Sequence, residues 1–230
     1  MIFAFDVDGT LTPSRQKMDE EFRQFFINFA IKNHVFLVTG SDYPKTEEQV
    51  GAEVCNIVDG IFNCCGNVLT IKGKEIYRND FELTEAEEQA LINELYLSGY
   101  HTRTGNHIEK RIGLVNFSIP GRNADWAIRQ SYIKWDTDKN ERYHIAERLN
   151  KYLTRFECVV GGETGIDIFL KDRDKSQIIE YTGRPLIFFG DRCEPKGNDH
   201  TLAMKADVYF NVRDWQETFS ILQEKYNDDY

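Results

Sequence analysis

Short apolar segments that end at acidic, hydroxyl or glycine residues recur along the chain. Residues 2–5 and 35–38 are the first two, and residues 185–189 and 208–210 repeat the pattern near the other end. A segment that is apolar on both faces is typical of a strand buried within a parallel sheet. We therefore predict that these four segments are core strands.

Helical patterns separate these segments. Asp19 can cap a helix in which four phenylalanines form one apolar stripe, namely Phe22, Phe25, Phe26 and Phe29. A second helix is expected through residue 50, and a last one from Asp214 to about Tyr226. Strands and helices that alternate with short connections are typical of a doubly wound α/β sheet.

The middle of the chain has a different order. Thr84 and Glu87 have the spacing of a capping box, and residues 112–119 alternate as a strand does. Helices at 124–135 and 139–153 and a strand at 165–171 follow. Because strand and helix do not alternate here, we predict an α+β module at residues 82–184, inserted into an α/β core formed by residues 1–81 and 185–230.

Composition narrows the class of protein. The 230 residues carry a net charge of −10, which disfavours a nucleic-acid binder, and the 41% hydrophobic content excludes general disorder. No apolar stretch approaches the roughly 18–20 residues of a membrane span. Asp6 and Asp8 interrupt any apolar leader, and the five cysteines lack CxxC spacing. We expect a cytoplasmic protein with reduced thiols and neither a nucleic-acid nor a membrane partner.

Carboxylates and hydroxyls follow three of the predicted core strands. The set comprises Asp6, Asp8, Ser41, Asp42, Asp191, Asn198 and Asp199. The carboxyl ends of adjacent parallel strands converge on one crevice, where ligands bind. Several carboxylates in one crevice repel one another unless a cation joins them, and Mg²⁺ prefers oxygen ligands and leaves positions for phosphate oxygens. The sequence therefore predicts a Mg²⁺ site there.

Such a site suits phosphoryl transfer. An Asp carboxylate beside Mg²⁺ can attack phosphorus and form an aspartyl-phosphate, and a second Asp two residues later could act as acid and base. Ser41 offers a hydroxyl and Lys175 a positive charge for the phosphoryl oxygens, with Gly9 and Thr10 as further donors.

These residues resemble a known superfamily. Asp6-x-Asp8-Gly-Thr, Ser41, Lys175 and Gly190-Asp191 followed by Asn198-Asp199 look like the four motifs of haloacid dehalogenase (HAD) phosphotransferases. The insertion between the second and third motifs is where that superfamily has a type 2 (C2b) cap. The alternative is that these residues only end strands and cap helices, and four motifs in the expected order disfavour it.

The resemblance extends to one family. Residues 5–17, 40–51, 113–122 and 189–200 look like segments of eukaryotic-type phosphomannomutases. It implies that Asp6 is the nucleophile and a Mg²⁺ ligand, and that Asp8 is the acid/base and a backbone ligand. The expected metal set is Asp6, Asp8, Asp191 and Asp199.

The same resemblance implies where the sugar phosphate binds. Arg111, Arg122 and Arg129 match the family's phosphate clamp, Asp167 matches a residue that holds a sugar hydroxyl, and Arg15 matches a core arginine near the substrate. Guanidinium groups grip phosphate in a bidentate manner, as a mutase that binds a bisphosphate in two orientations requires. If the chain is helical after Gly121, Arg122 and Arg129 are two turns apart on one face.

Four positions depart from the family pattern. They are Cys64-Cys65-Gly66-Asn67 after the third strand, Gly165 in place of the usual Ser, Glu109-Lys110-Arg111 in place of a stretch with an aromatic residue, and residues 203–206, which lack the carboxylate used for a second metal. The adjacent cysteines are interpreted as packing residues.

Three functions follow from these observations. The first is a phosphomannomutase that interconverts mannose 6-phosphate and mannose 1-phosphate, primed by a hexose bisphosphate activator and serving GDP-mannose biosynthesis. The second is a Mg²⁺-dependent sugar-phosphate phosphatase that uses the same carboxylates and admits water. The third, a non-catalytic binding protein, would require a missing carboxylate, and none is missing. The family also implies a homodimer formed through the cap.

Overall fold

The chain divides into two compact units. The computed structural model describes residues 1–195 and 197–226. The first unit comprises Met1–Asn79 and the chain from Asp172 onward, and the second comprises Asp80–Lys171. The second boundary therefore falls before residue 172 rather than near 184, because Ile178 is fully buried in the apolar core of the first unit.

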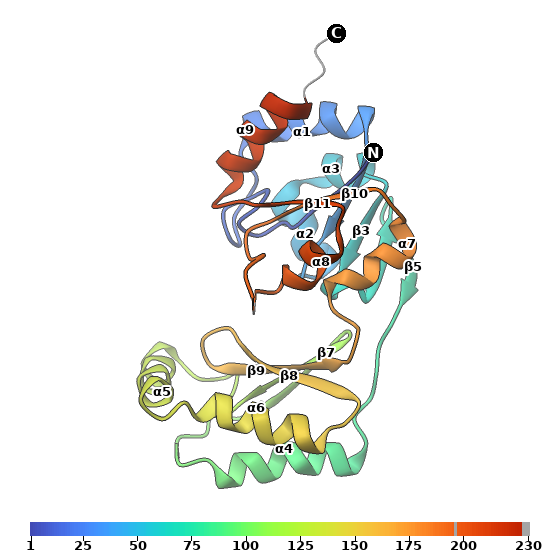
Figure 1. Ribbon diagram of the computed structural model, residues 1–230. Helices are drawn as coiled ribbons and strands as arrows, with labels where there is room; N and C mark the ends of the chain where they lie inside the picture. Colours follow the sequence, from blue (N-terminus) through green and yellow to red (C-terminus); the bar gives the residue numbers. More distant parts are fainter. Residues whose placement is uncertain (196, 227–230) are drawn as a thin grey trace. The chain divides into compact units, whose positions relative to one another are not determined.

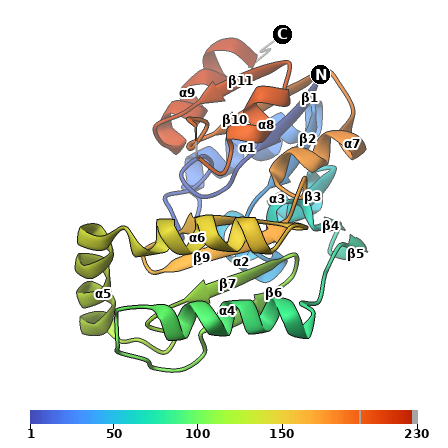
Figure 2. The ribbon, with the colours of Figure 1, turned by 60° about the horizontal axis from the view of Figure 1, so that its bottom comes forward.

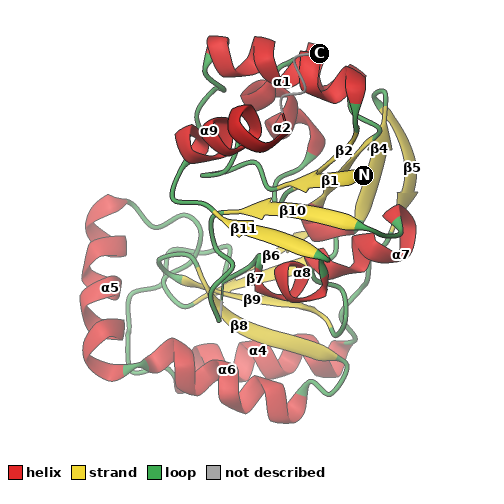
Figure 3. Ribbon diagram, turned by 45° about the horizontal axis from the view of Figure 1, so that its top comes forward, coloured by secondary structure: helices red, strands yellow, loops and turns green. Residues whose placement is uncertain are grey.

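The first unit is built on a seven-stranded sheet with the order β11-β10-β1-β2-β3-β4-β5 (Figure 3). Its five parallel strands are β1 (Ile2–Phe5), β2 (His34–Val38), β3 (Gly60–Asn63), β10 (Leu186–Gly190) and β11 (Val208–Asn211). Two antiparallel strands complete one edge, β4 (Val68–Ile71) and β5 (Lys74–Arg78). The parallel strands confirm the predicted α/β core.

Helices cover both faces of this sheet (Figure 1). On one face lie α1 (Glu20–Lys32), α2 (Tyr43–Val50), α3 (Ala52–Ile57) and α9 (Trp215–Tyr226). On the other lie η2 (Lys175–Ile178), α7 (Ile179–Thr182) and α8 (His200–Lys205). Phe3 and Phe5 of β1 point into the first layer and Ala4 into the second, so this strand is buried on both sides.

The phenylalanine stripe positions α1 on the sheet. The Asp19 carboxylate accepts hydrogen bonds from the backbone N–H groups of Glu21 and Phe22 and so begins the helix as predicted. Phe22 and Phe26 are fully buried, and the ring of Phe26 packs edge-on against Phe5 at 5.1 Å. Truncating such a buried Phe to Ala costs about 3–5 kcal/mol, so this stripe is a main source of the core's stability.

The second unit is a four-stranded antiparallel sheet with the order β6-β7-β9-β8. Its strands are β6 (Ile108–Arg111), β7 (Leu114–Ser118), β8 (Phe156–Gly161) and β9 (Gly165–Leu170), and its helices are α4 (Glu85–Leu97), α5 (Trp126–Lys139) and α6 (Glu141–Tyr152). α4 and α6 cover one face of the sheet (Figure 2). Leu91, Leu149 and Ile168 are buried between these layers.

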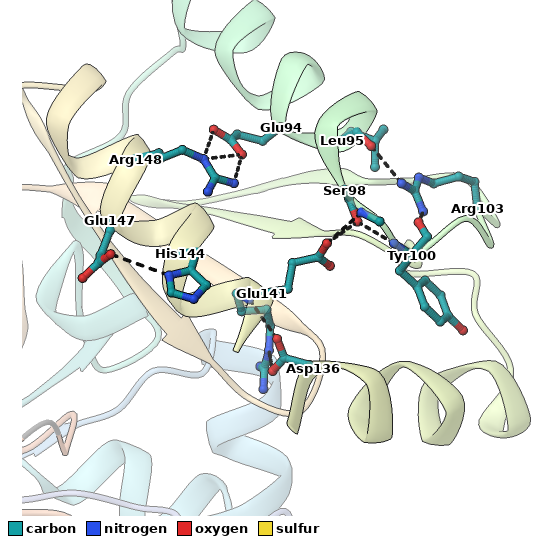
Figure 4. Close-up of polar contacts among 12 residues, drawn as sticks. Glu94, Leu95, Ser98, Tyr100, Arg103, Asp136, Glu141, His144, Glu147 and Arg148 are labelled. Carbon is teal, nitrogen blue, oxygen red and sulfur yellow. Dashed lines mark hydrogen bonds and ion pairs between the residues drawn. The ribbon is translucent and has the colours of Figure 1, made fainter. Parts of the chain in front are cut away.

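Charged pairs join the helices of this unit (Figure 4). The Glu94 carboxylate on α4 accepts hydrogen bonds from Nε and Nη2 of Arg148 on α6, the shortest of them 2.6 Å. Where α5 meets α6, Asp136 accepts from the Arg142 side chain at 2.8 Å. The backbone turns there through Asn140, which has a left-handed φ of 51°, so α5 extends four residues beyond the predicted end at 135.

Several helices and strands of the structure were not predicted from the sequence. β5 and β6 lie at sheet edges and consist mostly of polar residues, and β4, β8, α3 and the short 3₁₀ turn η1 (Cys64–Gly66) were also not anticipated. The capping box at Thr84 and Glu87 is confirmed. No disulfide joins the five cysteines, all of which lie in the described part of the chain. Among the described helices, none has the length and apolar character needed to cross a membrane.

An ion pair at the start of α4 makes the stability of the second unit depend on pH. Arg155 donates two hydrogen bonds of 2.7 Å to Glu87. This ion pair lowers the pKa of Glu87 from 4.5 to about 2. The stabilisation is therefore complete above pH 4.5 and is lost as the pH falls toward 2. We expect the Arg155→Met variant to show a smaller fall in melting temperature between pH 7 and pH 3 than the unmodified protein.

The control for this prediction is Lys110→Met. It removes an exposed ion pair in which Lys110 Nζ lies 3.4 Å from the Glu82 carboxylate. Such a pair contributes little to the free energy of unfolding, because water screens the two charges. This variant should follow the pH dependence of the unmodified protein. An unchanged pH dependence in Arg155→Met would contradict the assignment.

Candidate active site

Three carboxylates meet at the carboxyl edge of the parallel sheet. Asp6 follows β1 and Asp191 follows β10, and these neighbouring strands are paired in parallel. The backbone N–H of Asp6 donates to the Phe189 carbonyl at 2.9 Å, which extends the pairing of β1 with β10 to Asp6. Carboxylate oxygens of Asp6, Asp191 and Asp199 all lie within 4.8 Å of one another. The predicted convergence of strand ends is therefore observed.

A buried lysine joins two of these carboxylates. Lys175 Nζ donates to Asp6 Oδ1 at 2.5 Å and to Asp199 Oδ1 at 2.7 Å. Lys175 is 1% exposed and Asp199 is fully buried. The other oxygen of Asp199 accepts from the backbone N–H of Arg192, so both of its oxygens have donors. Asp199 thus orients the lysine toward Asp6.

The cluster holds excess negative charge. Burial raises the pKa of Asp6, and although Lys175 opposes this, the charges of Asp199 and Asp191 add to the rise. Burial and the charge of Asp199 likewise raise the pKa of Asp191 to about 6. Burial alone would lower the pKa of Lys175, but the two carboxylates outweigh it and the net shift is upward. Three carboxylates share one ammonium group, which is the electrostatic setting that a divalent cation offsets.

Gly9 allows the close approach of Asp191. Gly9 has a φ of +82°, a conformation that favours glycine. A β-carbon at this position would lie 2.3 Å from Asp191 Oδ2. Position 9 therefore requires glycine for two reasons, the positive φ of its backbone and the lack of space for a β-carbon beside Asp191.

The carboxylates open onto a cavity in the first unit. Its volume is about 620 Å³. Its lining includes the predicted residues Asp6, Asp8, Arg15, Ser41, Asp191 and Asn198. The structure thus brings together the predicted residues of three strand ends. Asp42, by contrast, caps α2 by accepting from the backbone N–H of Lys45 at 3.0 Å.

Asp8 is held by a residue that the sequence interpretation missed. Its Oδ1 accepts from the backbone N–H of Arg15 at 2.6 Å and from Gln49 Nε2 at 2.9 Å. Gln49 is 2% exposed and also donates to Thr12 Oγ1. A buried glutamine in a helix that follows a motif strand was the available signal, but its partner could not be inferred from spacing alone.

The unusual cysteine turn supports the loop that contains Ser41. The backbone N–H of Cys64 donates to the Ser41 carbonyl at 3.0 Å, and that of Cys65 donates to the Thr39 carbonyl at 2.8 Å. Both cysteines have a left-handed φ, 51° and 59°. Gln177 Nε2 donates to the Cys65 carbonyl at 2.8 Å, which ties this turn to η2. These contacts involve the backbone, and the interpretation of the two cysteine side chains as packing residues stays a prediction.

The three arginines of the predicted phosphate clamp lie in the second unit, and two of them contact the same residue. Arg111 and Arg122 both contact the carboxylate of Glu109, the Arg122 Nε at 3.1 Å. Arg129 contacts a different residue, Glu163, at 3.2 Å. Glu109 was noted in the sequence only as part of a departure, and its role in pairing two arginines was missed.

The predicted helical spacing of two clamp arginines is wrong. α5 begins at Trp126 with Asp125 as its cap, so Arg122 lies in the turn before the helix. Gly121 has a φ of +92°, and a β-carbon there would lie 2.1 Å from the Gly105 carbonyl oxygen. The backbone N–H of Arg122 donates to the Asn106 carbonyl at 3.0 Å, so this residue pairs with a neighbouring loop instead of joining the helix. Asp167 lies on β9, where it accepts from Asn116 Nδ2 at 2.6 Å.

The fold has counterparts among solved structures. A haloacid dehalogenase-like hydrolase from Bacteroides thetaiotaomicron aligns with a TM-score of 0.58 at 14% identity, over 89% of this chain and 85% of that one. A likeness at this level of identity shows the fold alone, and it confirms the predicted HAD-like fold.

Sequence comparison narrows the class to one family. The model of the eukaryotic phosphomannomutases matches residues 22–228. Phosphomannomutases of Saccharomyces cerevisiae and Galdieria sulphuraria are 30% and 31% identical, and each alignment covers 97% of this chain and 93% of the relative. The chain belongs to the eukaryotic phosphomannomutase family, which confirms the resemblance drawn from its motifs.

Removal of the buried lysine tests the electrostatics of the cluster. Lys175→Met leaves Asp6 and Asp199 buried without their cation. Breaking a buried ion pair from one side costs about 3–5 kcal/mol, and we expect a loss of this size in urea unfolding at pH 7. Lys205→Met is the matched control, because Lys205 Nζ donates to Ser176 Oγ and, among residues 1–195 and 197–226, contacts none of the three carboxylates. Equal stability of the two variants would contradict the role of Lys175.

Proposed function

We propose that this chain is a phosphomannomutase that interconverts mannose 6-phosphate and mannose 1-phosphate through an aspartyl-phosphate. The observation that carries the proposal is the position of Asp6, which lies at the end of β1, lines the cavity, and contacts the buried Lys175 at 2.5 Å. Family membership supplies the substrate class, since the curated relatives are phosphomannomutases.

The carboxylate cluster fits a bound Mg²⁺. Three mutually close carboxylates with only one ammonium group, and the raised pKa of both Asp6 and Asp191, support this assignment. Asp6 and Asp191 would hold the ion, with the backbone of Asp8 as the resemblance implies. Asp199, also predicted as a ligand, has both oxygens engaged by protein donors and is better placed to hold Lys175. When bound, Mg²⁺ offsets negative charge on the carboxylates and the phosphoryl group.

The chemistry is divided between two aspartates. A carboxylate oxygen of Asp6 forms a bond to phosphorus while the bond from phosphorus to the sugar oxygen breaks. Asp8 donates a proton to that leaving oxygen, and in the reverse step it removes the proton from the sugar hydroxyl that takes the phosphoryl group back. Gln49 and the backbone N–H of Arg15 hold the Asp8 carboxylate in place. Ser41 and Lys175 would donate hydrogen bonds to the phosphoryl oxygens.

The second unit would bind the distal phosphate and the sugar. Glu109 brings Arg111 and Arg122 to a single carboxylate, which supports their joint use on one phosphate group. Arg129 would add charge, and Asp167 would accept from a sugar hydroxyl. In the first unit, Arg15 would bind near the substrate, as the resemblance implies. The hexose bisphosphate activator, the homodimer and the route to GDP-mannose stay predictions of the resemblance.

Phosphorus NMR tests the proposed function. The protein is incubated with Mg²⁺, mannose 1-phosphate and a catalytic amount of glucose 1,6-bisphosphate. Growth of mannose 6-phosphate that depends on the bisphosphate, with little inorganic phosphate, is the expected result. Inorganic phosphate alone would instead identify the alternative function, a phosphatase in which water resolves the intermediate.

The nucleophile is tested in the same assay. We expect Asp6→Asn to abolish conversion, because the amide cannot replace the carboxylate in the attack on phosphorus. Asp19→Asn is the matched control, since Asp19 caps α1 and the asparagine retains that function. Unchanged turnover in Asp6→Asn would refute the covalent mechanism.

The first-motif glycine offers a test of the ion site. Gly9→Ala places a methyl group 2.3 Å from Asp191 Oδ2, so we expect a rise in the Mg²⁺ concentration needed for half-maximal turnover and a loss of about 100-fold in rate. Gly183→Ala is the control for backbone strain. Gly183 has a comparable φ of +73° and nothing within 4 Å of a β-carbon, so it should lose stability but keep its Mg²⁺ dependence. Similar effects of the two substitutions on Mg²⁺ dependence would exclude the steric account.

A further inference from the structure

Asn116 and Asp167 lie side by side on one face of the antiparallel sheet. They are direct cross-strand partners in the register of β7 with β9. Val115 and Ile168 beside them face the apolar core, so Asn116 and Asp167 point to the face opposite α4 and α6. Asn116 Nδ2 donates to Asp167 Oδ1 at 2.6 Å.

Two glycines make room for this pair. Gly161 and Gly165 are opposite each other in the register of β8 with β9. A β-carbon at Gly165 would lie 2.5 Å from Asn116 Nδ2, and one at Gly161 would lie 2.1 Å from Asp167 Oδ2. Neither glycine has a positive φ, so backbone freedom is not what these positions require. The requirement is space for the two side chains.

Asn116 is a poor choice for stability alone. It is 6% exposed, and its Oδ1 has no hydrogen-bond partner within residues 1–195 and 197–226. Burying an unsatisfied carbonyl oxygen is unfavourable, so a small apolar residue would suit packing better. A polar residue retained against this cost is expected where it serves a site.

The hydrogen bond leaves Asp167 with one oxygen for a ligand. In the described part of the chain, Asp167 Oδ2 accepts no hydrogen bond, and the side chain is half-buried. With Oδ1 committed to Asn116, the rotation of the carboxylate is fixed. A fixed carboxylate oxygen accepts from a sugar hydroxyl at a smaller entropic cost than a mobile one.

We propose that Asn116 is the positioning residue for Asp167 in sugar recognition, and that Gly165 determines whether Asn116 can take that position. This inference rests on the proposed function, in which Asp167 accepts from a sugar hydroxyl. A serine at position 165, the usual residue in the family, cannot coexist with the Asn116 side chain as it lies here. Asn116 must move away if Gly165 gains a β-carbon, and its bond to Asp167 is then lost.

Steady-state kinetics and a double-mutant cycle test the pair. Asn116→Ala should raise the KM for mannose 1-phosphate about tenfold with little change in kcat, since the lost interaction is shared by ground and transition states. Gly165→Ser should raise KM by a similar factor. In the Asn116→Ala background, Gly165→Ser should raise KM little further, because the Asn116 amide that the serine would displace is already absent.

Ser118→Ala is the matched control. Ser118 lies on the same strand and face, is equally buried, and donates to the Thr164 carbonyl rather than to Asp167. It should lower the melting temperature and leave KM unchanged, whereas Asn116→Ala should leave the melting temperature unchanged or raise it. A lowered melting temperature with unchanged KM in Asn116→Ala, or additive effects in the cycle, would overturn the proposal.

Binding measurements separate this inference from the proposed function. In the Asp6→Asn background, calorimetry with mannose 1-phosphate should show about tenfold weaker binding on Asn116→Ala, and calorimetry with inorganic phosphate should show no change. If the unmodified protein binds mannose 1-phosphate but does not convert it, the proposed mutase function is contradicted. The binding measurement then still tests the role of Asn116 beside Asp167. Equal binding of mannose 1-phosphate by Asn116→Ala and its parent, or none by the parent, would overturn the inference.

Discussion

The site depends on one buried ammonium group. Lys175 Nζ contacts both Asp6 and Asp199, and its charge is the main influence that opposes the raised pKa of Asp6. An unpaired carboxylate in this position would be strongly unfavourable, and a mobile lysine could not hold it in one orientation. The short η2 turn that presents Lys175 is fixed by the burial of Ile178 in the sheet's second layer. The packing of Ile178 in the core therefore also sets the position of Lys175 in the carboxylate cluster.

Features set by local sequence were predictable. The caps at Asp19 and Thr84, the buried parallel strands and the acidic strand ends all arise from neighbouring residues, and the structure contains them. The order of four spaced motifs indicated the HAD superfamily, because their order constrains the chain more than any single motif does. Longer segments around these motifs and in the inserted module indicated the family. The convergence of Asp6, Asp191 and Asp199 followed from the parallel strand order alone.

Features set by contacts between distant segments were not predictable. The support of Asp8 by Gln49 joins residues 41 positions apart, and the contact between Asn116 and Asp167 depends on the register of two strands 51 positions apart. The polar edge strands β5 and β6 gave no apolar period to detect. Arg122 lies outside α5, and its backbone N–H donates to the Asn106 carbonyl, a contact that spacing along the chain cannot reveal.

The strand order also has a consequence for synthesis on the ribosome. β1 is a central strand, and one of its two neighbours is β10, which begins at Leu186. The nascent chain therefore exposes one edge of β1 until the whole second unit and η2 have been translated. At about 5–20 residues per second, this interval lasts about 6–25 seconds after the first three strands have been translated. An unpaired apolar strand edge invites pairing with other chains, so chaperone protection during translation matters more for this topology than for one whose neighbouring strands are consecutive.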